Sequence, residues 1–207
     1  MLVIRTLDES PFSLGDVVDL IRVSFKSWQE HGLESSLIGV SEEDFKVKTS
    51  GGTILVVYDP DVKRLLGTEA FFYRGRGTKK FGFIGFLAVS PEAKRQGIAT
   101  RLFEDIKSRF VSNGIPYIIS DTACGVEWAI KWHLKTGFKK VGLVSYNTNN
   151  YYSIVFRYQI APSVLWNSML FTRLQYCIHY VATHILRNAD GSYTMLGRLI
   201  MKNRRHD

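Results

Sequence analysis

The segment that most constrains the fold is residues 87–110, LAVSPEAKRQGIATRLFEDIKSRF, where a strand-like run passes through a turn into an amphipathic helix. A single glycine, Gly97, directly precedes the helical pattern, and the cations Lys94 and Arg95 stand just before it. The first turn of a helix has backbone N–H groups without partners, and glycine lets a bulky anion approach them. Apolar residues at helical spacing hold the rest of the helix inward: Leu102, Phe103, Ile106 and Phe110. The segment therefore predicts a rigid anion site that suits a phosphate.

Two better-known phosphate motifs are absent from this segment. A P-loop requires GxxxxGK[ST], and a dinucleotide-binding turn requires GxGxxG after its first strand. Only Gly97 is present here, so neither motif fits.

Hydrophobic patterns divide the rest of the chain into short elements. Helices are predicted from the N-cap Ser13 to Trp28, from Ser41 onward, and over 126–138 with Gly137 as the stop. Strands are predicted at 2–7, 53–59, 64–74, 79–90, 117–120, 139–147 and 151–160, with turn residues between them. This order predicts an α+β (mixed α/β) fold, a mostly antiparallel sheet flanked by helices.

Composition excludes several classes of function. The 207 residues carry a net charge of +8, which favours anionic partners, but the basic residues are scattered and match no nucleic-acid recognition motif. The two cysteines, Cys124 and Cys177, form no CxxC or Cys/His cluster, so no metal site or disulfide framework is predicted. Neither a signal peptide nor a transmembrane run is recognised, which predicts a cytoplasmic protein.

The central segment resembles the Gcn5-related N-acetyltransferase (GNAT) family, whose signature [RQ]xxGx[GA] follows its fourth strand. Here the signature reads Lys94, Arg95, Gln96, Gly97, Ile98, Ala99, with Lys where the family usually has Arg or Gln. A later stretch, AIKWHLKTGFKKV, is similar to the family's helix that ends in Gly-Phe. The resemblance covers about three quarters of the chain and extends over residues 1–160, a predicted GNAT-like acyltransferase domain.

The resemblance implies an enzyme that binds acetyl-CoA between its fourth and fifth strands. The backbone of Leu87 and Val89 would bond the pantetheine arm, and the Val89 amide would stabilise the oxyanion. Residues that would hold the pyrophosphate are Lys94, Arg95, Gln96, Gly97, Ile98, Ala99 and Thr100.

Catalytic side chains are also transferred from the family pattern. His133 stands where many members have a Tyr that protonates the leaving thiolate, and the alternative is a half-buried histidine that packs beside Trp132. The fourth strand has no Glu, so Glu69 and Asp121 are the nearest candidate bases, with a water-relayed base as the alternative. Cys124 is better explained as a small residue at a strand end than as a nucleophile.

The implied reaction is direct transfer of an acetyl group from acetyl-CoA to a primary amine of a small molecule. Two alternatives stay open: acetylation of a protein lysine or N-terminus, and a degenerate module that binds acyl-CoA without catalysis. The loop SYNTNNYY, residues 145–152, offers hydroxyls and amides to a polar acceptor, or is only a hairpin loop.

Residues 161–207 are predicted to form a C-terminal helical extension with a basic tail. Its aromatic residues spread around more than one helical face, which is wider than packing on one sheet requires. Three interpretations stay open: a helix that completes the core, a homodimer contact, or a helix on the membrane surface.

Overall fold

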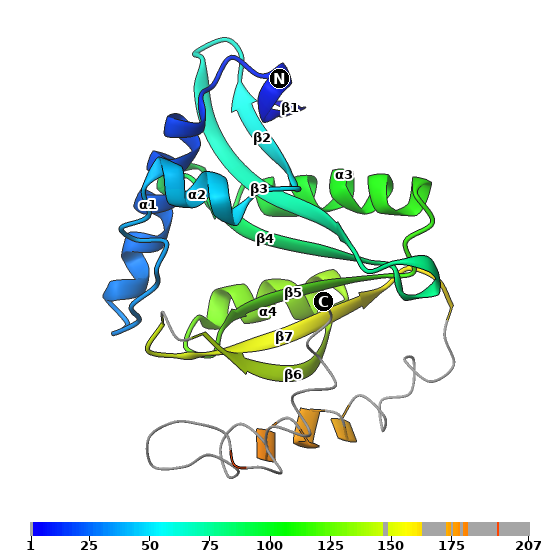
Figure 1. The fold of residues 1–207 in the computed structure, drawn as a ribbon. Helices are drawn as coiled ribbons and strands as arrows, with labels where there is room; N and C mark the ends of the chain where they lie inside the picture. Colours follow the sequence, from blue (N-terminus) through cyan, green and yellow to red (C-terminus); the bar gives the residue numbers. More distant parts are fainter. Residues whose placement is uncertain are drawn as a thin grey trace. The chain divides into compact units, whose positions relative to one another are not determined.

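The computed structural model describes residues 2–146, 149–162, 173–174, 176–178, 180–181 and 194. The chain divides into two compact units (Figure 1). Unit 1 comprises Met1–Arg74 and Gly82–Ile115, and unit 2 comprises Gly75–Phe81 and Pro116–Asp207. The predicted domain boundary at residue 160 stays a prediction.

Unit 1 contains four strands in the order β1-β2-β3-β4. Their bounds are β1 Val3–Thr6, β2 Thr53–Asp59, β3 Arg64–Arg74 and β4 Phe81–Val89, of which Phe81 belongs to unit 2. The β1–β2 and β2–β3 pairs are antiparallel. Short 3-10 turns follow β1 at Leu7–Glu9 and precede β4 and α3 at Gly77–Lys79 and Pro91–Ala93.

Helices cover both faces of the unit 1 sheet. The helices α1 Leu14–Gln29 and α2 Glu42–Lys48 bury an apolar cluster against β2 and β4, with Ile21, Phe45 and Val56 at its centre. On the opposite face lies α3 Ile98–Ser112, whose Phe110 meets the ring of Phe71 edge-on at 5.6 Å. Adjacent residues of β3 point to opposite faces, so Phe71 faces α3 while Phe72 packs with Phe86 on the other side.

Serine caps begin the first two helices, as predicted. Ser13 accepts a hydrogen bond from the Asp16 N–H at 3.2 Å, and Asp16 bonds back to the Ser13 N–H at 2.7 Å, which completes a capping box. Ser41 accepts from the Asp44 N–H at 3.0 Å. Both caps satisfy amide groups that a helix start leaves without partners.

Unit 2 contains three antiparallel strands in the order β5-β7-β6 and the helix α4. Their bounds are β5 Tyr117–Ala123, α4 Glu127–Thr136, β6 Lys139–Ser145 and β7 Tyr152–Gln159. β5 continues three residues beyond its predicted end because it pairs along its whole length with β7. Gly137 ends α4 with φ +102°, as predicted for a C-terminal glycine.

The predicted C-terminal extension lies largely outside the described residues. Residues 173–174, 176–178 and 180–181 are helical, and Leu174, Ile178 and Tyr180 are exposed. The choice between core helix, dimer contact and membrane-surface helix is therefore still a prediction.

Candidate active site

The start of α3 differs from the starts of α1 and α2. Its N-cap is Gly97, with φ +78°, and no side chain caps the helix. A Cβ built on Gly97 meets no atom within 4 Å, so the space beside the first backbone N–H groups of α3 is open. Just before it, Lys94, Arg95 and Gln96 are exposed, whereas Ile98 is 1% exposed and anchors the first turn. The start of α3, which has no capping side chain at Gly97, thus lies at an accessible position beside two cations, as an anion site requires.

Strained backbone marks the same region. Among the described residues, non-glycine residues with positive φ are Lys63, Phe86 and Arg95. A left-handed conformation costs an L-residue roughly 1–2 kcal/mol, and such residues concentrate at functional sites. Arg95 lies in the predicted pyrophosphate loop and Phe86 lies in β4 beside Leu87. No sequence signal indicated Phe86, because aromatic residues disfavour this conformation.

The C-terminal end of β4 presents the backbone groups of Leu87 and Val89 on the side away from β3. The Ser90 N–H donates to the Leu66 carbonyl at 2.8 Å and so points toward β3. Backbone groups alternate along a strand, so those of Val89 point the other way. The Ser24 hydroxyl of α1 donates to the Val89 carbonyl at 3.0 Å, a contact that no sequence motif predicts.

His133 lies in the interior of unit 2 with both ring nitrogens in hydrogen bonds. Nδ1 lies 2.8 Å from the Ala129 carbonyl and must donate to it, so Nε2 accepts from the Ser120 hydroxyl at 2.9 Å. The ring stacks on Phe156 at 4.4 Å and is 4% exposed. Burial lowers the pKa of His133 to about 4, although the Ala129 bond acts in the opposite direction. These are the surroundings of a neutral, interior imidazole, and its role as an acid stays a prediction.

We expect His133 to make the protein less stable at acidic pH. Its pKa is about 4 in the folded state and about 6.5 when unfolded, so the unfolded chain takes up this proton first. The stabilisation is complete above pH 6.5 and is lost as pH falls toward 4, by up to about 3 kcal/mol. Urea unfolding at pH 5.0 and 7.5 should show a smaller pH dependence for His133→Gln than for the native protein.

His31→Gln, at an exposed position, serves as the control and should keep the native pH dependence. An unchanged pH dependence of stability in His133→Gln would contradict the lowered pKa of His133 in the folded protein. Turnover of His133→Ala separates the roles further. A fall in turnover at unchanged acetyl-CoA affinity supports His133 as the catalytic acid. Native turnover indicates that His133 has only a structural role.

Glu69 lies in unit 1 beneath α3. A Cβ at Gly67 would approach Ile98 and Leu102, and Phe71 contacts Phe110, so Glu69 between them faces the same helix. The side chain is 1% exposed, and its Oε2 has no hydrogen-bond partner. Desolvation raises the pKa of Glu69 well above its ordinary value, which favours the neutral acid. The assignment of Glu69 as general base therefore stays a prediction.

Replacing Glu69 with Met should stabilise the protein at alkaline pH. The pKa of Glu69 is higher when folded than when unfolded, so the contribution of Glu69 to stability is greatest below about pH 4.5 and falls as pH rises toward the folded value. Met at this position neither ionises nor leaves a buried oxygen without a partner. At pH 8 we expect the free energy of unfolding to rise by about 1–3 kcal/mol, measured by urea denaturation. The exposed Glu43→Met should lack this effect, and a destabilised Glu69→Met would contradict the prediction.

Cys124 follows β5 and is an exposed free thiol. Partial desolvation raises its pKa, with Lys140 acting in the opposite direction. The protonated thiol is the weaker nucleophile, so the structure gives no support to a covalent route through Cys124.

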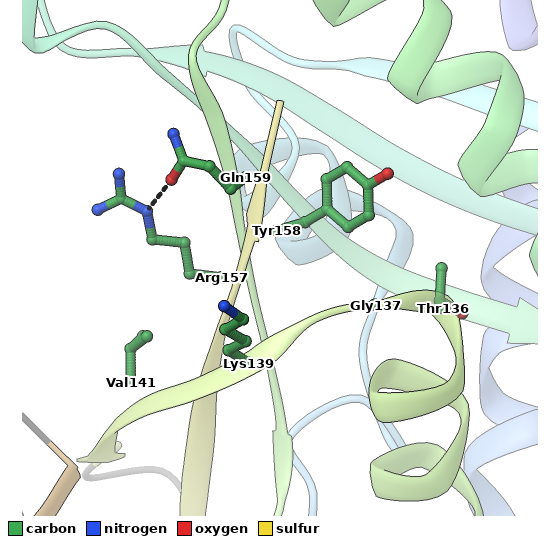
Figure 2. A pocket seen from close by; sticks show the side chains of 7 residues that line it. All are labelled: Thr136, Gly137, Lys139, Val141, Arg157, Tyr158 and Gln159. Atoms are coloured by element: carbon green, nitrogen blue, oxygen red, sulfur yellow. Dashed lines mark hydrogen bonds between the residues drawn. The ribbon is translucent and has the colours of Figure 1, made fainter. Parts of the chain in front are cut away.

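A pocket of about 290 Å³ lies in unit 2 at the end of α4 (Figure 2). It is lined by Thr136, Gly137, Lys139, Val141, Arg157, Tyr158 and Gln159. Arg157 lies over the Tyr117 ring at 3.6 Å and donates through Nε to Gln159 at 3.1 Å. None of the predicted acetyl-CoA or catalytic residues lines this pocket.

Two structural absences hold for the described part of the chain. No group of three or more His, Cys, Asp or Glu side chains there could hold a metal ion. No helix in the same part combines the length and apolarity needed to cross a bilayer.

The fold and the start of α3 together define a class of protein. An antiparallel sheet with helices on both faces, and a helix that begins at an uncapped glycine after two cations, is typical of the α+β acetyltransferases. A model of the acetyltransferase (GNAT) family matches residues 14–138, more than half of the chain. The chain belongs to this family, and the predicted resemblance is confirmed.

Solved structures with the same fold confirm the predicted fold class. The ribosomal-protein-S18-alanine N-acetyltransferase of Escherichia coli aligns with a TM-score of 0.58 at 13% identity, covering 79% of this chain and 96% of that one. An N-acyl amino acid synthase from uncultured soil microbes aligns with a TM-score of 0.56 at 16% identity, covering 84% and 99%. A GNAT family acetyltransferase from Elizabethkingia anophelis, with acetyl-CoA bound, gives a TM-score of 0.53 at 13% identity, covering 77% and 98%. Comparison with curated proteins by sequence finds no match.

Proposed function

We propose that the protein transfers an acetyl group from acetyl-CoA to a primary amine of a small molecule by direct attack. The observation that carries this proposal is the uncapped, open start of α3 at Gly97, preceded by Lys94 and Arg95. The pyrophosphate of CoA supplies the anionic oxygens that these amides and cations require. Family membership and a relative with acetyl-CoA bound support the choice of donor.

Binding of the donor would use residues 94–100 and the backbone of Leu87 and Val89. The loop would surround the pyrophosphate, and the outward backbone groups of β4 would bond the pantetheine arm as an added strand does. The Ser24 hydroxyl already donates to the Val89 carbonyl. The Val89 N–H is the proposed donor to the thioester oxygen. His133 remains the proposed acid and Glu69 a proposed base.

The reaction is proposed to take place in the cytoplasm. Cys124 and Cys177 are both free cysteines, as is usual in a reducing compartment. A protein acceptor is the second possibility within the same reaction class, because one structural relative is named for an alanine of a ribosomal protein.

The proposal is tested by measuring acetyl-CoA binding and thiol release with the native protein. Calorimetry gives the dissociation constant, and a thiol reagent follows CoA release with glucosamine, ethanolamine, butylamine, spermidine and an alanine-terminated peptide. Release with a small amine supports the proposal, whereas release with the peptide alone would favour a protein acceptor. Tight binding without release from any acceptor or water would indicate a binding module, and no binding would overturn the proposal.

A further inference from the structure

The pocket at the end of α4 has a chemistry of its own, apart from the proposed acetyl-CoA site (Figure 2). β6 begins at Lys139, opposite Arg157, so Tyr158 and Gln159 at the end of β7 extend past the start of β6. Thr136, the last residue of α4, also lines the pocket. Every lining residue belongs to unit 2. The pocket is therefore built within one compact unit.

Two cations of this pocket lie next to each other in the sheet. The antiparallel register pairs Lys139 with Arg157, so both side chains project from the same face. Side chains at paired positions are separated by only about 5 Å at Cβ, and like charges there destabilise a sheet. An anion bound between the two charges would offset their repulsion.

The guanidinium of Arg157 is held in a defined orientation. Its Cζ lies 3.6 Å from the centroid of the Tyr117 ring, and its Nε donates to the Gln159 side-chain oxygen at 3.1 Å. The Gln159 amide nitrogen donates in turn to the carbonyls of Pro116 and Ala161, at 3.2 and 2.7 Å. The two terminal nitrogens lie at the far end of the Arg157 side chain (Figure 2). Because this fork is oriented in advance, it loses little entropy when it binds an anion.

The described part of unit 2 contains few carboxylates that could serve these cations. Its acidic side chains are Asp121 and Glu127, and neither lines the pocket. Glu127 begins α4, at the end opposite the pocket, and forms an ion pair within that helix at 2.9 Å. Asp121 pairs with Val155, two residues before Arg157, whereas the Nε bond directs Arg157 toward the end of β7. An anion in the pocket would therefore come from a ligand.

The charge and size of the pocket indicate which anion fits. Lys139 and Arg157 carry two positive charges, and a phosphate monoester carries about 1.5 to 2 negative charges at pH 7. A guanidinium can bond two phosphate oxygens at once, and a lysine ammonium adds a compact point charge. The volume of about 290 Å³ lies near the lower limit of ligand pockets, and Val141 and the Tyr158 ring offer apolar surface to a small organic group.

We propose that this pocket binds a small phosphate monoester, with Arg157 bonding two of its oxygens and Lys139 neutralising the remaining charge. The site is independent of the proposed function, because it shares no residue with the proposed acetyl-CoA site. The ligand would connect the end of α4 with the start of β6 and the end of β7. It would stabilise the fold by RT ln(1 + [L]/Kd).

The test follows the backbone amide resonances of Gly137, Lys139 and Gln159 while glycerol 3-phosphate is added at constant ionic strength. We expect saturable shifts in the native protein and a dissociation constant that rises about tenfold or more in Arg157→Gln and in Lys139→Gln. Lys135→Gln is the matched control, because it removes the same charge from an exposed position on α4 outside the pocket. Its affinity should stay within about twofold of the native value.

Each result either supports the site or overturns it. Absence of saturable shifts in the native protein, or equal weakening in Lys135→Gln, overturns it. Gly97→Glu, at the proposed pyrophosphate site, should leave the shifts unchanged, and their loss in that variant would assign the phosphate to α3 instead. If Arg157→Gln does not fold, Lys139→Gln decides, and native affinity there overturns the site. Succinate tests the chemical class: weaker binding than glycerol 3-phosphate supports a phosphate group, and equal or tighter binding overturns that choice.

Discussion

Replacing Gly97 with Glu should weaken acetyl-CoA binding by about 100-fold or more. The new carboxylate would stand at the start of α3, where the pyrophosphate is proposed to bind, and would repel it. It would also interact with the N–H groups that a phosphate would otherwise use. A loss of 100-fold corresponds to about 2.8 kcal/mol of binding free energy, which calorimetry measures directly.

Gly114→Glu is the matched control for backbone strain. Gly114 follows the same helix at its other end, with φ +65° against +78° for Gly97, and an added Cβ at either meets no atom within 4 Å. Both variants should lose a similar amount of stability in urea, because both force a side chain into the left-handed region. Only Gly97→Glu should lose acetyl-CoA, and equal affinities in the two variants would overturn the pyrophosphate site.

Gly67→Ala should destabilise the protein by about 1–3 kcal/mol and disturb acetyl-CoA binding as well. Gly67 lies in β3, where an added Cβ would be 2.5 Å from Cγ2 of Ile98 and 3.5 Å from Cδ1 of Leu102. Ile98 is the first residue of α3, so we expect relief of this overlap to shift the helix start away from the sheet. We expect acetyl-CoA affinity to fall about tenfold, because the amides would leave their proposed position.

A double variant tests the cause of this effect. Ile98→Ala removes the methyl group that the new Cβ would meet, so Gly67→Ala should cost less in its presence than alone. A coupling of about 1 kcal/mol or more in urea unfolding would support direct overlap, whereas additive effects would contradict it. Gly39→Ala provides the control, since an added Cβ there has open space.

The local beginnings and ends of helices were predictable because they depend on adjacent residues. Ser13 and Ser41 cap their helices through the backbone three positions later, and Gly137 ends α4 in a left-handed conformation. The glycine at position 97 was equally predictable, since an anion site at a helix start needs only a short segment.

Contacts that depend on strand register were not predictable in the same way. Ser153 lies opposite both Ala123 and Val144 because β7 pairs with both β5 and β6, and a change of register by one residue would turn its side chain to the other face. β3 is buried on both faces over Leu66–Phe72, so its hydrophobic pattern does not show which face Glu69 occupies. The same limit applies to Ser24, whose bond to Val89 joins residues 65 positions apart.

The missing cap of α3 links donor binding to the folding of this helix. α1 and α2 satisfy their first amides with serine side chains, whereas α3 would rely on a ligand for the same purpose. On the proposed function, CoA completes the helix as an exchangeable cap, and stabilises the fold by RT ln(1 + [L]/Kd). Amide hydrogens in the first turn of α3 should then exchange slowly with the bound donor and quickly without it. In the cell, the thermal tolerance of the protein would follow the size of the CoA pool.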